Sequence, residues 1–180
     1  FEDGMDFGVK IKYVVQEKQL GTSHSLKQVE GLVDDQFFIV NGDNIIDMQT
    51  FQDLLDGAGG DASLLTTIRS DVSGYGIVVW KYGKVSELLE KPTYFPSYSI
   101  NTGMYRFSKA VFKEIDETRI SERGDYEITN TIQNMIKKGY DIRAVNTTAT
   151  WFDVVYPWDL IKVNGAILKG LGGAVKGTIE

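Results

Sequence analysis

The chain has 180 residues, and its composition excludes several classes of protein. Hydrophobic residues make up 42% of the sequence and charged residues 24%, which is ordinary for a folded globular domain. The formal net charge is −6, whereas proteins that bind nucleic acid through its phosphates are usually basic. No apolar run approaches the ~20 residues that span a bilayer, and the absence of cysteine excludes disulfides and thiolate metal sites. We therefore expect a cytoplasmic protein with no nucleic-acid or membrane partner.

The front of the chain alternates predicted strands and helices. Strands are expected at 9–15, 37–40 and 62–68, where β-branched or apolar residues concentrate. Helices are expected between them, at 22–30 with Thr22 as N-cap and at 48–55. The run 37–40 is continuously apolar, which indicates a strand buried on both faces. This β-α-β-α-β order predicts parallel pairing with right-handed crossovers.

The second half departs from this alternation. Two short strands at 76–80 and 85–89, joined by the turn 82–84, are typical of a hairpin. Further elements are expected in the order strand 100–107, helix 109–115, helix 126–138, strand 141–146 and helix 157–168. The sequence therefore predicts an α/β fold whose mixed, mostly parallel sheet carries an inserted antiparallel hairpin.

Two aspartates are candidates for a metal site. An acidic protein must bind phosphorylated ligands locally, through a metal, a few cations or backbone N–H groups. Asp43 follows a strand, where ligands of open α/β sheets bind, and its carboxylate suits Mg²⁺. Gly42 before it would let the backbone approach a ligand closely, and Asp153 is a candidate second carboxylate. The alternative is that Gly42 and Asp43 only form a turn and that Asp153 only stabilises a helix N-terminus.

Polar residues at other element ends could hold a sugar phosphate or another polar or anionic ligand. Gly21 and Thr22 lie where a helix N-terminus could accept an anionic or polar group. Glu90 could accept hydrogen bonds from hydroxyls, Lys91 could pair with a phosphate, and Asn101 could do either. Taken singly, the same residues fit a strand–helix turn, a cross-strand ion pair and a turn asparagine.

Seven short segments occur in one order along the chain: Gln-x-x-Gln-Leu-Gly-Thr, Asn-Gly-Asp, Gly-Tyr-Gly, Glu-Lys-Pro, Asn-Thr-Gly, Tyr-Glu-Ile-Thr-Asn and Trp-Phe-Asp-Val. In this order they resemble the sugar-1-phosphate nucleotidyltransferases. That family includes glucose-1-phosphate thymidylyltransferase and the uridylyltransferase domain of the bifunctional N-acetylglucosamine-1-phosphate enzymes. The resemblance covers residues 8–180 and implies a Rossmann-like nucleotide-diphospho-sugar transferase fold.

The resemblance also implies roles for individual residues. Carried over by position, it assigns nucleotide contacts to Gln16, Gly21, Thr22 and Gly42, a Mg²⁺ ion to Asp43 and Asp153, and sugar-phosphate contacts to Gly76, Glu90, Lys91 and Asn101. Asp43, Asp153 and Lys91 would be the catalytic residues, and Glu127 receives no firm role. The family often has glycine two residues after the second aspartate, where this chain has Val155.

The implied reaction belongs to nucleotide-sugar biosynthesis. A sugar-1-phosphate, with glucose-1-phosphate favoured, would attack dTTP or UTP and give an NDP-sugar and pyrophosphate. Such catalysis needs no protein nucleophile, because it depends mostly on positioning and on charge neutralisation.

The resemblance finally implies segments beyond the two ends of the sequence. The family's first strand and Gly-x-Gly-Thr-Arg loop are missing and would precede Phe1, so we expect a partial nucleotidyltransferase domain over 1–169 that is inactive alone. The sheet edge exposed by that loss would favour a homo-oligomer. The glycine-rich stretch 170–180 is expected to be a linker and the start of a left-handed β-helix domain.

Three other functions remain open from the sequence. The first is a non-catalytic, sugar-nucleotide-binding regulatory module of the same fold. The second is a metal-dependent glycosyltransferase of the related fold, although those enzymes usually carry Asp-x-Asp where this chain has Asp43-Asn44-Ile45. The third is a structural scaffold that carries a β-helix.

Overall fold

The computed structural model describes residues 1–170, so the linker and β-helix predicted for 170–180 lie outside the described residues except for Gly170. The strands are β1 (Gln36–Val40), β2 (Asn44–Ile46), β3 (Ala62–Ile68), β4 (Ile77–Lys81), β5 (Lys84–Leu89), β6 (Ser99–Ser108), β7 (Ile142–Asn146) and β8 (Trp151–Asp153). The helices are the 3-10 turn η1 (Met5–Phe7), α1 (Thr22–Lys27), α2 (Met48–Gly57), α3 (Ala110–Asp116), α4 (Ile128–Lys137) and α5 (Asp159–Gly170).

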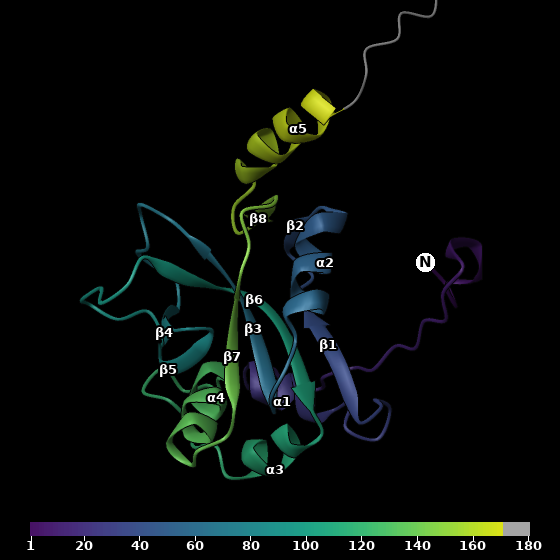
Figure 1. Cartoon of the computed structure of the whole chain (residues 1–180). Coiled ribbons are helices and arrows are strands. Elements are labelled where there is room, and N and C mark those ends of the chain that lie inside the picture. Colours follow the sequence, from purple (N-terminus) through teal and green to yellow (C-terminus); the bar gives the residue numbers. More distant parts are fainter. Residues whose placement is uncertain (171–180) are drawn as a thin grey trace, which may run out of the picture.

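Six strands form a mixed sheet in the order β1-β6-β3-β7-β5-β4 (Figure 1). Within it β3 and β7 pair in parallel, whereas β6 pairs antiparallel with both β1 and β3. The expected α/β fold with a mixed sheet and the β4–β5 hairpin are confirmed. The expectation that the sheet is mostly parallel is wrong, because among the described strands only β3 and β7 pair in parallel. The expected direct parallel pairing of β1 with β3 is wrong, because β6 lies between them and bonds to both.

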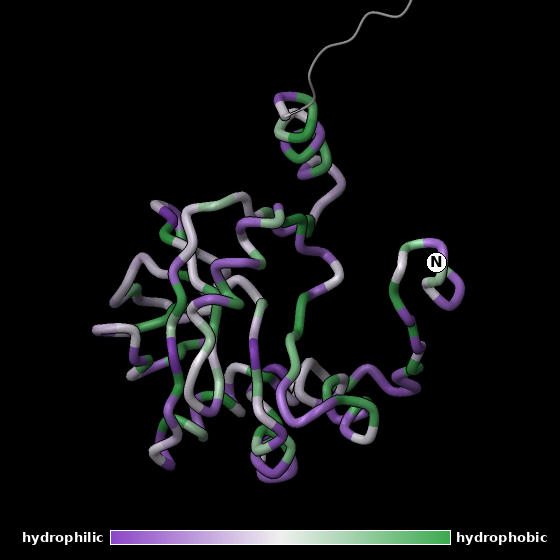
Figure 2. Tube along the Cα trace, turned by 45° about the vertical axis from the view of Figure 1, so that its right-hand side comes forward, coloured by the Kyte–Doolittle hydropathy of each residue, from purple (hydrophilic) through white to green (hydrophobic). Residues whose placement is uncertain are grey.

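Two hydrophobic cores lie on opposite faces of this sheet. Helices α1, α3 and α4 cover one face, where Leu64 and Phe107 are fully buried. Helix α2 and strand β8 cover the other face around Leu65 and Met104. Neighbouring residues of β3 therefore point to different cores, as the period of two in a strand requires. Figure 2 shows that hydrophobic and hydrophilic residues are interspersed along the chain.

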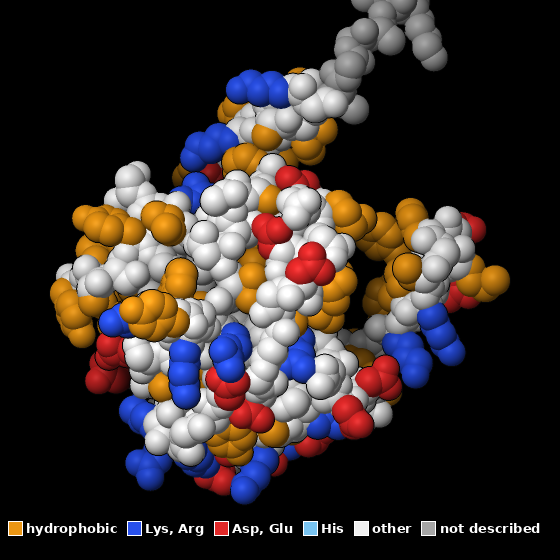
Figure 3. All heavy atoms as spheres, in the orientation of Figure 1, with side chains coloured by type: hydrophobic (Ala, Val, Ile, Leu, Met, Phe, Trp, Pro, Cys, Tyr) orange, Lys and Arg blue, Asp and Glu red, His pale blue; other side chains and the backbone are white. Residues whose placement is uncertain are grey.

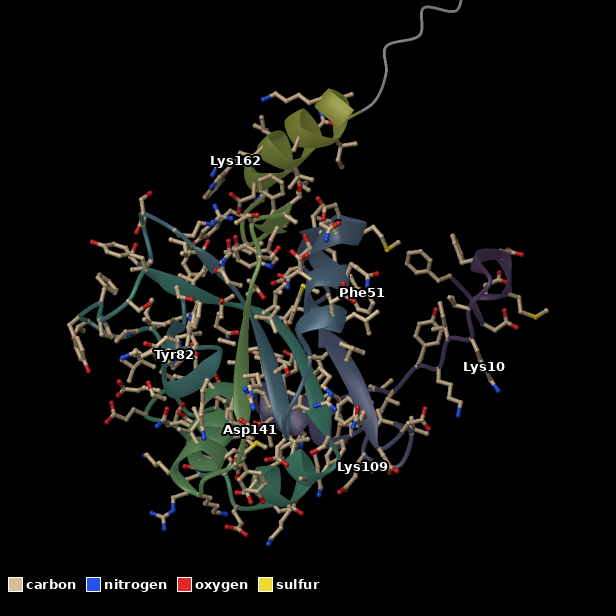
Figure 4. The ribbon with its side chains drawn as sticks, viewed as in Figure 1. Lys10, Phe51, Tyr82, Lys109, Asp141 and Lys162 are labelled. Carbon is tan, nitrogen blue, oxygen red and sulfur yellow. The ribbon has the colours of Figure 1, made fainter. Side chains whose placement is uncertain are left out.

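The predicted strand at 9–15 is wrong. This segment has no regular structure, and Tyr13 and Val15 are 68% and 72% exposed. A strand persists only where a neighbour satisfies its backbone N–H and C=O groups, and no strand among residues 1–170 lies beside this segment. It runs away from the sheet, and Lys10 stands apart from the body of the protein (Figures 1 and 4).

The prediction that the apolar run at 37–40 is buried on both faces is also wrong. The run does form a strand, β1, but Phe38 and Val40 are 36% and 42% exposed. Among the described strands β1 pairs only with β6, so it lies at an edge of the sheet. The continuous apolar run correctly predicted a strand, but it did not show how many other strands would pair with it.

A second, smaller sheet was not predicted. Strands β2 and β8 pair antiparallel, with Asn44 opposite Asp153. Asp47 ties this ribbon to α2, because its side chain accepts a hydrogen bond from the Thr50 amide (2.8 Å) and from the Thr150 amide (3.2 Å). Asp47 is therefore both the N-cap of α2 and a link to the segment just before β8.

The pKa of Asp47 gives a test of this link. The hydrogen bond from the Thr50 backbone is the largest cause that lowers this pKa from 3.8 to about 2. A carboxyl whose folded-state pKa is lowered stabilises the fold above its unfolded pKa, and this stabilisation is lost as the pH falls through the folded value. We expect Asp47→Ala to lower the free energy of unfolding at pH 7 by about 1 kcal/mol.

The measurement is urea denaturation of wild type and Asp47→Ala at pH 7, 4 and 2. The difference between the two proteins should shrink from pH 4 to pH 2, because the wild-type carboxyl becomes protonated. Asp34→Ala, at an exposed position in the loop before β1, serves as the control and should change little. A difference that is independent of pH would contradict the assignment.

Candidate nucleotide and sugar-phosphate site

One cleft of about 360 Å³ gathers most of the residues predicted from the sequence. It lies where the β2–β8 ribbon, the start of β4, the end of β5, the first half of β6 and the N-terminus of α4 meet. The predicted site residues on its wall are Gly21, Thr22, Asp43, Gly76, Glu90, Lys91, Asn101 and Asp153. Two predicted residues are not on this wall. Gly42 lines a neighbouring apolar groove, and Gln16 donates a hydrogen bond to the Gly21 carbonyl (3.3 Å).

The β2–β8 ribbon brings the two candidate metal carboxylates to one end of the cleft. The Val154 amide donates to the carbonyl of Asp43 (2.9 Å), one step along the chain from Asp153. Tyr75 donates its hydroxyl to Asp153 Oδ1 (3.0 Å). Burial raises the pKa of Tyr75 to about 12, helped by the Asp153 carboxylate, so the hydroxyl remains a donor at neutral pH.

The chemistry of these two side chains fits a magnesium ion. Neither Asp43 nor Asp153 takes part in a salt bridge among residues 1–170. No cluster of three or more His, Asp or Glu side chains in this part of the chain is arranged for a metal. Magnesium needs no such cluster, because it is commonly held by one or two carboxylates together with water and substrate phosphates.

Another part of the cleft wall offers hydrogen-bond acceptors beside a small residue. Asn101 donates through its backbone N–H to the Gly76 carbonyl (2.8 Å) and through Nδ2 to the Tyr105 hydroxyl (2.6 Å). A Cβ added at Gly76 would lie 3.4 Å from Asn101 Cβ and 3.6 Å from Glu90 Oε2. Glycine at this position therefore leaves room between an amide and a carboxylate, which is suitable for a hydroxyl-rich ligand.

Two cations, Lys91 and Arg123, stand on the same wall. Lys91 is exposed and has a φ of +40°, which is unusual for a residue other than glycine. Arg123 donates from Nη2 to Glu90 (3.0 Å) and to Glu127 (2.7 Å). The cleft wall thus carries two cations that could hold a phosphate as well as the carboxylates of Asp43 and Asp153.

Comparisons with known proteins identify the family. The sequence profile described as nucleotidyl transferase matches residues 1–170. The bifunctional protein GlmU of Methanocaldococcus jannaschii is 33% identical over 172 residues, which cover 95% of this chain and 41% of that protein. The chain belongs to the nucleotidyl transferase family. A glucose-1-phosphate thymidylyltransferase of Streptomyces antibioticus is 34% identical over 184 residues, covering 99% of this chain and 51% of that protein.

The solved structures of nucleotidyl transferases agree with the fold. A Bacillus anthracis protein assigned as a glucose-1-phosphate thymidylyltransferase, solved with sucrose, superposes with a TM-score of 0.80 at 26% identity. The match covers 97% of this chain and 71% of that one. The chain spans about half or less of the length of the curated relatives named above. None of the helices within residues 1–170 combines the length and hydrophobicity needed to cross a membrane.

Membership of the nucleotidyl transferase family decides between some of the open alternatives. A metal-dependent glycosyltransferase and a structural scaffold do not account for a family match over nearly all of the described chain. A non-catalytic module within the family is still an alternative, because family membership alone does not establish turnover.

Two residues of this nucleotidyl transferase have different local roles from those predicted. Helix α1 is shorter than expected, and Gly21 rather than Thr22 is its N-cap residue. Thr22 instead accepts a hydrogen bond from the Ile128 amide (2.9 Å), so it caps the N-terminus of α4. Gly21 has a φ of +103°, and a Cβ there would lie 2.7 Å from the Tyr126 backbone. The loop that contains Gly21 is therefore packed directly against the segment that begins α4.

Sequence reasoning missed Arg123 and Tyr75 as residues of the site. Arg123 lies in a loop outside any periodic element, and only its position ahead of Tyr-Glu-Ile-Thr could have drawn attention to it. Tyr75 stood inside the Gly-Tyr-Gly segment, where attention went to Gly76. Both are placed by tertiary contacts with residues more than 30 positions away in the sequence.

A substitution at Gly103 tests how the turn 41–44, which contains Asp43, is supported by β6. It lies in β6 where the β3–β6 register shifts, and its φ is +78°. A Cβ there would collide with the side-chain amide of Asn41. We expect Gly103→Ala to destabilise the protein by roughly 2–4 kcal/mol, from left-handed strain together with overpacking.

Gly74→Ala is the matched control for this substitution. Gly74 has a similar φ of +81°, but nothing lies within 4 Å of an added Cβ. Gly74→Ala should lower the free energy of unfolding only by the left-handed backbone strain, which is about 1–2 kcal/mol. Free energies of unfolding in urea compare the two variants, and equal losses would show that the Asn41 contact is unimportant.

Proposed function

We propose that the protein transfers a nucleotidyl group from a nucleoside triphosphate to a sugar-1-phosphate, releasing pyrophosphate, in a magnesium-dependent reaction. The observation that carries this proposal is the composition of the cleft. Its wall carries Asp43 and Asp153, whose backbones the β2–β8 ribbon brings together, and it also carries Glu90, Asn101 and the cations Lys91 and Arg123. A site that must join two phosphorylated molecules needs both a metal and local cations, because the substrates repel each other.

The chemistry is a substitution at phosphorus. An oxygen of the sugar-1-phosphate forms a bond to the α-phosphorus of the triphosphate, and the bond from that phosphorus to the β-phosphate oxygen breaks. Pyrophosphate leaves with the electron pair of the broken bond. A magnesium ion held by Asp43 and Asp153 would neutralise charge on the phosphate oxygens.

The side chains of the cleft bind and orient the substrates. Lys91 and Arg123 attract the phosphate of the sugar and thereby offset its repulsion from the triphosphate. Glu90 accepts hydrogen bonds from sugar hydroxyls, and Asn101 fixes the ring position. Tyr75 holds the Asp153 carboxylate in one orientation. On the opposite wall, the loop at Gly21 and Thr22 faces the nucleotide.

We further propose glucose-1-phosphate and dTTP as the substrates, with UTP as the next candidate nucleotide. The relative from Streptomyces antibioticus is named for glucose-1-phosphate and thymidylyl transfer. These substrates are assigned to the whole protein of which the cleft is one part.

The experiment measures pyrophosphate release with Mg²⁺ for every pairing of dTTP or UTP with glucose-1-phosphate or N-acetylglucosamine-1-phosphate. The chain and the full-length product of its gene are assayed side by side. We expect release in one pairing by the full-length protein, and Asp43→Asn or Asp153→Asn should lower kcat/KM by roughly a hundredfold or more.

Two controls make this result interpretable. Asp56→Asn, at an exposed position near the end of α2, should leave the rate unchanged. Binding of Mn²⁺, followed by its paramagnetic resonance signal, should weaken in both site variants whether or not turnover occurs. Folded protein that binds nucleotide but releases no pyrophosphate in any pairing would favour the non-catalytic module instead.

A further inference from the structure

Glu127 is a buried acidic residue at the cleft that the proposed reaction does not use directly. Its side chain is only 8% exposed, and it occupies the N-cap position of α4. A carboxylate at such a position usually accepts a hydrogen bond from the first turn of its own helix. Here it makes no such bond. Thr22, from α1, accepts the bond from the Ile128 amide in its place.

The Glu127 carboxylate is therefore available for the loop that precedes it. Its Oε1 atom accepts hydrogen bonds from Ser121 Oγ (2.8 Å), Arg123 Nε (2.9 Å) and Arg123 Nη2 (2.7 Å). The loop is closed by two backbone bonds, from Gly124 to Ser121 (2.9 Å) and from Ser121 to Asp125 (2.9 Å). All the donors to Glu127 thus come from this one turn.

The contact with Glu127 fixes the orientation of the planar guanidinium group of Arg123. Glu127 engages Nε and Nη2 on one edge of the group, and Glu90 accepts from the same Nη2 (3.0 Å). The remaining nitrogen, Nη1, makes no hydrogen bond among residues 1–170, and the residue lines the cleft. The pair with Glu127 is also the largest cause that raises the pKa of Arg123. One edge of the cation is thus occupied by the protein, while Nη1 is left for a ligand.

We infer that Glu127 is a positioning residue, which holds Arg123 so that its open edge meets the phosphate of the sugar-1-phosphate. The inference rests on the proposed function for the identity of that phosphate. Without Glu127, a long and half-exposed arginine would lose rotamer entropy each time it bound the substrate. Glu127 restricts the rotamers of Arg123 before the substrate binds. It therefore strengthens the binding of the sugar-1-phosphate and leaves the binding of the nucleotide unchanged.

The first test is Glu127→Gln, which keeps the shape of the side chain and removes its charge. We expect the KM for the sugar-1-phosphate to rise roughly tenfold while the KM for the nucleotide changes little. Glu114→Gln is the matched control. Glu114 is also buried and paired, with Lys138 (2.6 Å) and Tyr140 (2.9 Å), but it is not on the cleft wall. It should lower stability and leave both KM values unchanged.

A double-mutant cycle tests whether Glu127 acts through Arg123. In an Arg123→Lys background, Glu127→Gln should add little further increase in the KM, since the geometry that it maintains is already lost. Ser121→Ala, which removes one neutral donor, should raise the same KM by a smaller factor and covers the case in which Glu127→Gln does not fold. Additive effects, or equal increases in both KM values, would overturn the inference.

Limited proteolysis separates this inference from the proposed function. Trypsin cleaves after arginine, and Glu127→Gln should cleave faster after Arg123 than wild type, relative to cleavage after Arg119 in the same molecule. This holds whether or not the protein releases pyrophosphate. Unchanged cleavage after Arg123 would overturn the positioning role. Faster cleavage, together with no turnover by the full-length protein in any substrate pairing, would leave that role supported and the proposed reaction refuted.

Discussion

Two carboxylates repel each other, so a metal site made of them depends on the backbone that holds them together. In this protein that backbone is the short β2–β8 ribbon, with Asn44 opposite Asp153 and the Val154 amide bonded to the Asp43 carbonyl. A ribbon of three residues on each side cannot be stable alone. Its position therefore depends on contacts with the rest of the fold.

Those contacts come from both sides of the ribbon. Asn44 donates from Nδ2 to the Thr102 carbonyl of β6 (2.8 Å), which ties β2 to the main sheet. Arg69 donates to the Trp151 carbonyl (3.0 Å) and lies 5.3 Å from the centre of its ring. Hydrogen bonding and a cation–π contact thus hold β8 at the same time. Asp43 is exposed and Asp153 is partly buried, and these contacts hold the backbone of both residues at the cleft.

The sequence predicted the strong elements and much of the site. The strand at 62–68 and the helix around 128–137 were recoverable, because long apolar or amphipathic periods are local signals. Eight of the ten predicted site residues line one cleft, since they end elements that converge in space. On the face drawn in Figure 3, hydrophobic, basic and acidic side chains are interspersed.

The failures have a common cause, because each concerns a pairing that no local pattern specifies. Strands β2 and β8 are too short to show any period. The sequence marked β6 as a strand but not its insertion between β1 and β3, which left β1 half exposed at an edge. The segment 9–15 has the composition of a strand, yet composition cannot supply a neighbour to pair with.

Strand β6 connects these observations, because it belongs to both cores and to the cleft. Met104 packs with Trp151 on the face that carries the β2–β8 ribbon, while Phe107 packs on the opposite face with the residues of α4. Between the start of β6 and these residues, the register shift at Gly103 redirects the strand beneath the Asp43 turn. The carboxylates depend on one core and the Arg123–Glu127 pair on the other. A single strand that contributes to both cores therefore links the packing behind the carboxylates to the packing behind the Arg123–Glu127 pair.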